Sequence, residues 1–295
     1  MILRKPHLQL TAPLTGLLLW LAACTNTADT RYQPTFASTT GLQHEIVFGA
    51  PSLAYYEIAD PTMKYLNAHL DSLHVRTVAC TSVEDYEDKL RKGFFDFTVI
   101  NGPQLVTAEQ SGYTVVGKIA DDYHALIFVN KDSGIDDFRD CNDRTIALTG
   151  NRILAGSVMP LLYLYDHGVD VNNHLKKLYS PSYESVMLDV CLGKCAIGAV
   201  WSTPYETFQR KRPDLASRLQ VKWTTPSQAS SAILFRRNVN RDVAQKIAQL
   251  LFGLSGNEQG RKALQRIGIS RFEPADSTTY LSMKKFLRKY DSLIH

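Results

Sequence analysis

The residues best placed to bind a ligand lie in the stretch from Thr145 to Val169. Its short apolar run, Thr145–Leu148, predicts a buried strand, and an apolar helix that ends at His167–Gly168 follows. The loop between them carries three polar side chains, Thr149, Asn151 and Arg152. In a strand–loop–helix unit with a glycine-containing loop, the unpaired backbone N–H groups at the start of the helix point toward a bound ligand. The charge of Arg152 would add to the positive potential of these groups. The alternative is an ordinary strand-to-helix connection with a solvated arginine.

Further polar and aromatic side chains follow other predicted strands. We take as additional binding candidates Tyr55, Tyr56, Asn101, Gln104, Tyr183 and Trp201. The aromatic rings could stack on a ligand, and the amides could both donate and accept hydrogen bonds. Each candidate also has a structural interpretation, which is core packing for the aromatic residues and an ordinary turn for the amides.

Catalytic and metal-binding motifs are absent from the sequence. It contains no G-x-S-x-G, no H-E-x-x-H and no G-x-x-x-x-G-K-[ST], and its eight histidines are scattered. We therefore expect no enzymatic activity, no cofactor and no metal. The remaining enzymatic alternative is a nucleophilic Cys191 or Cys195 on the same fold. These two cysteines could instead form a disulfide in an exported protein, or stay as two small buried thiols.

The N-terminus has the pattern of a bacterial lipoprotein signal. Arg4 and Lys5 precede the apolar stretch Pro13–Ala23, which is too short to span a bilayer. The sequence Leu-Ala-Ala-Cys that ends at Cys24 resembles the lipobox, in which the cysteine is diacylated and becomes the first mature residue. We therefore predict an exported protein, anchored by lipid at the cell envelope and facing the periplasm. The alternative is an ordinary signal peptide followed by an unrelated cysteine.

The composition of the mature chain argues against a nucleic-acid partner. Residues 24–42 are polar and rich in threonine, which predicts a flexible tether. The chain has 33 basic and 29 acidic side chains, and the loss of Arg4 and Lys5 with the signal leaves a formal charge of +2. No block of like charge is present. We expect a monomer that binds a small molecule.

The body of the chain alternates predicted strands and helices, which indicates an α/β protein with mostly parallel sheets. Ala50–Asp60 is predicted as a loop, with a helix starting at Asp60-Pro61. An apolar crossing at Tyr123–Asn130 and a polar return at Thr224–Ser231 separate two such runs. This pattern predicts a first lobe made of residues 43–126 and 232–295, and a second made of residues 127–231. Ligands of such folds bind in a cleft outside the carboxyl ends of the strands.

Several segments, in order, resemble the phosphate/phosphite/phosphonate-binding family of ABC-transporter solute receptors. They are Gly49-Ala50-Pro51, Gly102-Pro103, Val129–Ala147, Ala155–Pro160 with His167–Asp170, and Ser182–Val200. The resemblance implies the type 2 periplasmic-binding fold, in which two lobes close around a solute by a hinge. It also implies delivery of the solute to an ABC permease. A sensor subunit that signals to a membrane kinase is the alternative role.

The positions that hold the ligand in this family differ in this sequence. A run of three hydroxyl residues before the glycine of the lip helix is replaced by Ile153-Leu154-Ala155. The family's histidine corresponds to Tyr183, its acidic residue aligns near Ala196, and a tyrosine after Gly-Pro falls near Val106. Each change removes or alters a polar contact to an oxyanion. We therefore expect a small solute other than a phosphonate, with an anion still among the candidates.

Overall fold

The computed structural model describes residues 45–51, 53–100 and 102–294 of the 295-residue chain. The chain divides into two units, residues 1–42 and residues 43–295. The predicted signal peptide, the tether and Cys24 lie outside the described residues, and so does Asn101. The fold described below belongs to the second unit.

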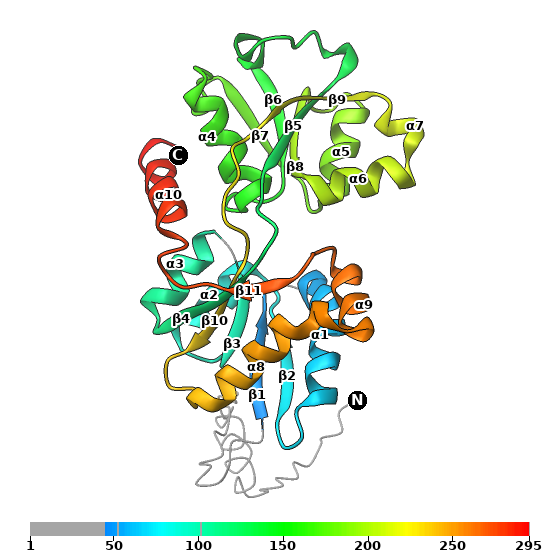
Figure 1. Ribbon diagram of the computed structural model, residues 1–295. Helices are drawn as coiled ribbons and strands as arrows, with labels where there is room; N and C mark the ends of the chain where they lie inside the picture. The colour runs from blue at the N-terminus through cyan, green and yellow to red at the C-terminus, as the bar shows by residue number, and fades with distance from the viewer. Residues whose placement is uncertain (1–44, 52, 101, 295) are drawn as a thin grey trace, which may run out of the picture. The chain divides into compact units, whose positions relative to one another are not determined.

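The first of two sheets has six strands in the order β11-β4-β10-β3-β1-β2 (Figure 1). Its strands are β1 Glu45–Ala50, β2 His74–Ala79, β3 Phe97–Ile100, β4 Tyr113–Ile119, β10 Ala232–Arg236 and β11 Phe272–Pro274. The second sheet has five strands in the order β7-β6-β8-β5-β9. Its strands are β5 Ala125–Asn130, β6 Arg144–Leu148, β7 Leu175–Tyr179, β8 Ile197–Trp201 and β9 Leu219–Thr224.

Helices cover both faces of each sheet. They are α1 Leu53–His69, α2 Val83–Arg91, α3 Pro103–Gln110, α4 Met159–Asp166, α5 Tyr183–Cys191, α6 Ser202–Lys211, α7 Pro213–Ala216, α8 Arg241–Gly253, α9 Glu258–Ile267 and α10 Leu281–Leu293. A π-helical turn, Leu154–Val158, leads directly into α4. Short 3₁₀ turns occur at Lys131–Ser133, Phe138–Cys141 and Leu254–Gly256. None of the helices in the described ranges has both the length and the apolar composition that a membrane-spanning segment needs.

Both sheets are mixed, and the crossings are the reason. Strands β1, β2 and β3 run parallel to one another, as do β6, β7 and β8. The chain enters the second sheet through β5 and returns to the first through β10, and each of these strands is antiparallel to its neighbours. The α/β architecture and the two crossings are as predicted, but the sheets contain more antiparallel pairing than strict βα repetition implies.

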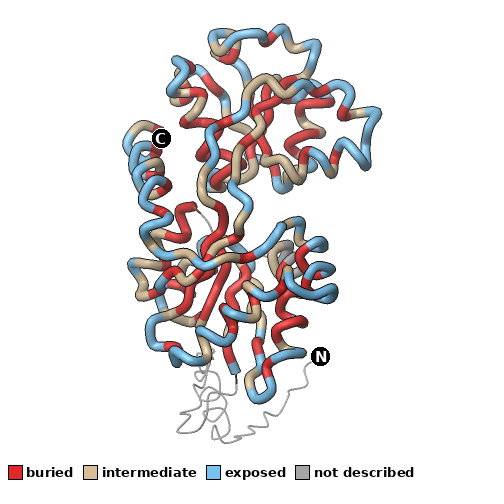
Figure 2. Tube along the Cα trace, viewed as in Figure 1, coloured by how far each residue is buried: buried red, intermediate tan, exposed pale blue. Residues whose placement is uncertain are grey.

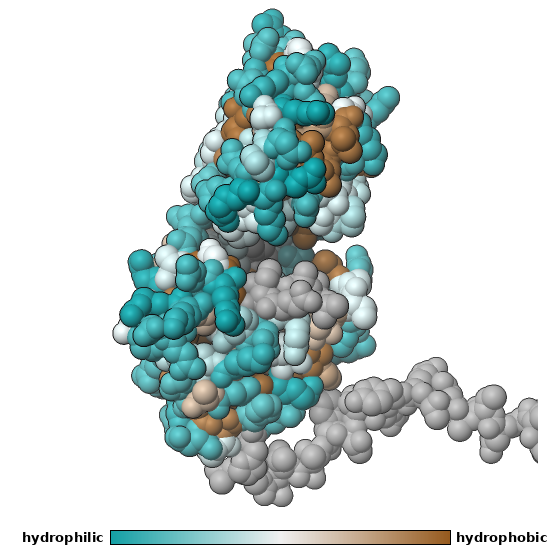
Figure 3. Space-filling view, turned by 90° about the vertical axis from the view of Figure 1, so that its right-hand side faces the viewer, coloured by the Kyte–Doolittle hydropathy of each residue, from teal (hydrophilic) through white to brown (hydrophobic). Residues whose placement is uncertain are grey.

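The buried side chains form three clusters, which Figure 2 shows as the red segments inside each sheet and its helices. One cluster joins β1 and β3 to α1 and α8, and another joins β8 to α5 and α6. The third and largest contains residues of α2 and α3 from the first sheet's helices, of β6 and α4, and of α10. The C-terminal helix therefore packs into a core that includes residues attached to both sheets. On the face shown in Figure 3, hydrophilic residues predominate and hydrophobic ones form only small patches.

The start of α1 differs from the prediction. The helix begins at Leu53, so Tyr55 and Tyr56 lie on a helix and not in a loop, and Pro61 is inside it. An internal proline costs about 3 kcal/mol. Burial of Ala59, Met63 and Leu66 against the first sheet offsets that cost, at about 1.5–3 kcal/mol for each large side chain. The Asp-Pro pair that suggested a helix start is therefore internal.

Several short elements were not predicted from the sequence. Pro103 is the first residue of α3, a position where proline needs no N–H. The edge strands β7, β9 and β11 were not predicted. Their sequences (LKKLY, LQVKWT and FEP) are short and contain charged residues. Charged residues are tolerated there because an edge strand has a neighbouring strand on one side only.

Candidate functional site

The loop and π-helical turn after β6, residues 149–158, form what we call the lip. The turn at Gly150 has a positive φ of 68°, which glycine adopts without strain. The buried Ser157 hydroxyl accepts a hydrogen bond from Ile153 N at 3.0 Å and donates to Ile153 O at 3.0 Å. Thr149 N donates to Gly156 O at 3.1 Å. These internal bonds fix the backbone of the lip and use the N–H of Ile153.

The lip packs against the turn that precedes α3. Leu154 and Ala155 are buried, and the Cβ of Leu154 lies 3.3 Å from where a Cβ on Gly102 would be. Gly102 also has a positive φ of 58°, so both its conformation and this close approach favour glycine. The residues at 153–155 therefore make an apolar contact and present no side-chain donor.

Arg152 is held by the C-terminal helix. Its Nη1 donates to Asp291 Oδ1 at 2.8 Å and its Nη2 to Asp291 Oδ2 at 3.4 Å. The hydrogen bond that Arg152 donates to the Asp291 carboxylate is the main cause that raises the pKa of Arg152. The guanidinium predicted to face a ligand is thus already paired, while its neighbour Asn151 is exposed.

Thr149 differs from the rest of the lip because its hydroxyl is unused. Its Oγ1 atom is buried and has no hydrogen-bond partner in the structure. A buried polar atom without a partner costs about 1–3 kcal/mol. Thr149 is therefore a side-chain donor that a bound acceptor group could satisfy.

We call four aromatic side chains near the first crossing the aromatic group: Tyr55, Tyr123, Tyr183 and Trp201. The rings of Tyr123 and Trp201 are edge to face, with centroids 5.1 Å apart. The indole N–H of Trp201 donates to the hydroxyl of Tyr183. The hydroxyl of Tyr55 donates to Val99 O at the end of β3. Helix α1, the crossing, the start of α5 and the end of β8 thus each contribute one ring.

The hydroxyls of Tyr55 and Tyr183 are neutral at physiological pH. Burial is the main cause that raises the pKa of Tyr55, and Tyr123 adds to the effect. The same two causes, in the same order, raise the pKa of Tyr183. Neutral phenols and aromatic faces can hydrogen-bond to a solute and stack on it, and they carry no charge. Tyr123 was not a predicted site residue, although it opens the stretch predicted to cross between the lobes.

The other candidates are placed as follows. Tyr56 is partly buried against the core of the first sheet. Gln104 is buried, and its Nε2 donates to Glu87 Oε1 at 3.3 Å. The structure therefore brings Tyr183 and Trp201 together, bonds the hydroxyl of Tyr55 to Val99 O, and pairs Arg152 and Gln104 with carboxylates. Which of them contact a solute stays a prediction.

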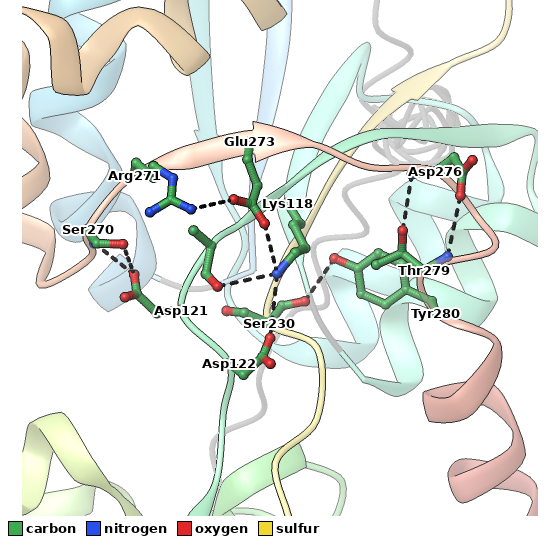
Figure 4. Close-up of polar contacts among 11 residues, drawn as sticks. Lys118, Asp121, Asp122, Ser230, Ser270, Arg271, Glu273, Asp276, Thr279 and Tyr280 are labelled. Carbon is green, nitrogen blue, oxygen red and sulfur yellow. Dashed lines mark hydrogen bonds and ion pairs between the residues drawn. The ribbon is translucent and has the colours of Figure 1, made fainter.

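The C-terminal segment supports both crossings (Figure 4). Near the end of β4, the Nζ of Lys118 lies 3.2 Å from Glu273 Oε1 and 3.5 Å from Asp122 Oδ1. Asp121 accepts hydrogen bonds from Ser270 N at 2.7 Å and from its Oγ at 2.9 Å. On the return, the buried hydroxyl of Tyr280 donates to Ser230 O at 2.9 Å. These contacts tie both crossings to the chain around β11.

The cysteines do not form the disulfide that their spacing allowed. Cys191 and Cys195 are both free and buried, as are Cys80 and Cys141. The Sγ of Cys191 lies 3.3 Å from Leu215 O as a donor, and both thiols pack in the core beside β8. This agrees with the alternative of two buried thiols. Within residues 45–51, 53–100 and 102–294, no group of acidic, histidine or cysteine residues is arranged to hold a metal ion.

Comparison with known proteins places residues 50–280 in one family model, described as the periplasmic substrate-binding protein of phosphonate ABC transporters. A curated relative is the phosphonates-binding periplasmic protein of Escherichia coli K12, which is 20% identical over 176 residues. That match covers 58% of this chain and 52% of the relative, so it spans about half of the relative's length.

Solved structures with the same fold come from several bacteria. A Prochlorococcus marinus protein in complex with methylphosphonate has a TM-score of 0.75 and 17% identity, over 84% of this chain and 98% of its own. A binding component of a phosphonate transporter from Pseudomonas aeruginosa has a TM-score of 0.71 and 20% identity, over 84% and 88%. A Xanthomonas citri protein bound to ATP has a TM-score of 0.72 and 18% identity, over 86% and 100%. These likenesses show the type 2 periplasmic-binding fold.

Proposed function

Because this chain belongs to the family of periplasmic substrate-binding proteins of phosphonate ABC transporters, we propose that it captures a small solute at the lip and the aromatic group and delivers it to an ABC permease. The family consists of solute receptors and not of enzymes. The observation that carries the proposal is the contact of Trp201 with Tyr123 and Tyr183, close enough to Tyr55 on α1 for Tyr123 to raise the pKa of Tyr55. These rings come from elements attached to both sheets, as binding between two lobes requires.

The solute would be recognised by rings and neutral donors. Tyr183 can offer its hydroxyl, and Thr149 Oγ1 has no partner and would gain one from an acceptor on the solute. The residues at Ile153–Ala155 offer no side-chain donor, and Arg152 is paired with Asp291. A solute with a planar or apolar part and a few hydrogen-bonding atoms fits these groups better than a free phosphonate does.

Binding would be coupled to closure of a hinge at the two crossings. A ligand shifts an open–closed balance only if it contacts the two sides differently in the two states. Tyr55 precedes the first crossing in the chain, Tyr183 and Trp201 follow it, and Tyr123 lies on it. A solute held by all four would meet that condition. We further propose that Cys24 carries the lipid that keeps this receptor, as a monomer, at the membrane.

A thermal-shift screen of neutral, anionic and ammonium-bearing metabolites tests the proposal, followed by X-ray scattering with any solute that stabilises the protein. We expect a stabilising solute and a smaller radius of gyration in its presence. The variant Tyr183→Ala should weaken that binding on the order of tenfold, the effect of losing an aromatic contact of about 1.4 kcal/mol. Tyr179→Ala, an exposed tyrosine on β7, is the matched control and should bind normally.

Two results would count against the proposal. A hit whose affinity is the same for Tyr183→Ala and for the wild type would remove the aromatic group from the site. Solute binding that leaves the scattering unchanged would argue against hinge closure. Copurification of the receptor with a membrane kinase, and not with a permease, would favour the sensor role over transport.

A further inference from the structure

The pairing of Arg152 with Asp291 joins the lip to a residue 139 positions away on α10. Arg152 is the only basic side chain in residues 149–158. Its two terminal guanidinium nitrogens, Nη1 and Nη2, each donate to one oxygen of the Asp291 carboxylate, at 2.8 and 3.4 Å. This two-pronged arrangement is the one by which arginine binds a carboxylate or a phosphate group. Asp291 thus occupies the position that an oxyanionic ligand would take on this guanidinium.

The Asp291 carboxylate is held in place by the helix that carries it. One face of α10 is buried through Met283, Leu287 and Tyr290. Two residues before Asp291, Lys289 pairs with Asp166 at the end of α4 at 2.6 Å. Two residues after it, Leu293 O accepts a hydrogen bond from Asn172 Nδ2 at 2.8 Å. Asp291 is therefore preorganised toward Arg152, and the pair does not depend on ordering a mobile chain.

A second carboxylate also compensates the charge of this guanidinium. It belongs to Glu87 on α2, which raises the pKa of Arg152 as Asp291 does. Glu87 is itself paired with Arg91 at 3.4 Å and accepts a hydrogen bond from Gln104. An incoming phosphate group would meet two carboxylates and two arginines that already balance one another. It would gain little attraction and would have to displace Asp291.

We propose that Asp291 is a specificity-determining residue, an internal carboxylate that excludes oxyanionic solutes from the lip by occupying Arg152. The inference rests on the proposed function, because it takes the lip as part of the binding site. The proposed role of Asp291 is to reject oxyanionic solutes. Binding sites commonly reject a class of ligand by means of a group that competes with it or repels it. If Asp291 no longer bound Arg152, the lip would offer an anion three groups: the free guanidinium, the unpaired hydroxyl of Thr149 and the start of the helix that leads into α4.

The test is the affinity of the full-length mature protein for methylphosphonate, measured by calorimetry. Asp291→Asn keeps the size of the side chain and removes its charge. An exposed ion pair contributes up to about 1 kcal/mol, so this variant should bind methylphosphonate more tightly than the wild type, by up to about fivefold. Asp166→Asn is the matched control, because it frees Lys289 on the same helix and leaves Arg152 paired. It should bind as the wild type does.

A second experiment tests whether the increase in methylphosphonate affinity depends on Arg152. The double variant Arg152→Gln/Asp291→Asn should not show that increase. The inference is overturned if folded Asp291→Asn gains nothing, if Asp166→Asn gains equally, or if the double variant keeps the gain. Asp291→Ser, judged by the same criteria, replaces Asp291→Asn if that variant does not fold. A further outcome is that the wild type closes on another solute while Asp291→Asn shows no increase in affinity for methylphosphonate. In that case only the role of Asp291 is wrong, and the proposed function stands.

Discussion

Lys284 Nζ on α10 lies 2.6 Å from Glu109 Oε2 on α3, and less than a fifth of either side chain is exposed, 19% and 17%. The same helix contacts the second sheet's elements through Lys289 and Asp291. Helix α10 therefore carries charged contacts to elements attached to both sheets. Its pairs differ greatly in exposure, which allows their contributions to stability to be separated.

Removing Lys284 should destabilise the protein much more than removing an exposed lysine. Lys284→Met leaves the partly buried Glu109 carboxylate unpaired, and we expect a loss of about 2–3 kcal/mol in the free energy of unfolding. Lys64→Met is the matched control. It breaks an exposed pair with Asp60, in which the lysine is 76% exposed, and should cost less than about 1 kcal/mol. Urea denaturation measures both. Equal losses would show that the Lys284–Glu109 pair behaves as an ordinary surface pair.

The pair between Lys118 and Glu273 should make stability depend on acid pH. The hydrogen bond from Lys118 lowers the pKa of Glu273 below its ordinary value. A carboxylate with a lowered folded-state pKa stabilises the fold above its unfolded pKa of about 4.3, and this contribution is lost as the pH falls through the folded-state pKa. The wild type should therefore be more stable than Lys118→Met at pH 7, and the difference should shrink below about pH 4. A difference that is constant with pH would contradict this account.

The four cysteines of the folded part should be free and slow to react. Burial raises the pKa of Cys80 to about 11 and that of Cys141 to about 12, and the pKa values of Cys191 and Cys195 are raised by the same cause. In the Cys24→Ser variant, prepared without reductant, thiol titration should find four thiols after unfolding and almost none rapidly accessible before it. A count of two after unfolding would mean that a disulfide forms in the exported protein.

Phosphate, phosphite and 2-aminoethylphosphonate should bind the wild type poorly, with dissociation constants above about 100 μM, or roughly −5.5 kcal/mol. The apolar Ile153–Ala155 segment provides no hydroxyl donors, and Leu154 and Ala155 are buried. Calorimetry with each anion checks the expectation. Low-micromolar binding of any of them would show that other groups replace the missing hydroxyls.

Cys24 should be the lipidated first residue of the mature protein. The sequence Leu21-Ala22-Ala23-Cys24 places the cleavage before the cysteine. Mass spectrometry of protein extracted from membranes should find the diacylated N-terminus, and Cys24→Ser should abolish it. A wild-type protein that is unmodified and freely released would contradict the prediction.

Individual helices and strands of this fold could be predicted because the spacing of apolar residues and the capping residues that define them lie close together in the sequence. Helix α2 is an example. In α2, Tyr86 and Leu90 are spaced to face the core, and the side chain of Ser82 caps the first turn. The start of α1 was missed for the converse reason, since its burial against the first sheet outweighs the cost of Pro61.

The sequence by itself determined the family pattern, the two crossings and the absence of hydroxyl donors at Ile153–Ala155. These properties depend on residue types and spacing along the chain. Only the tertiary structure decided that Arg152 is paired with Asp291, that Tyr123 packs near Tyr183 and Trp201, and that Cys191 and Cys195 are buried free thiols. Each of these depends on where a distant segment packs. An ion pair between residues 139 positions apart leaves no periodicity in the sequence, because it is set by the burial of one face of α10.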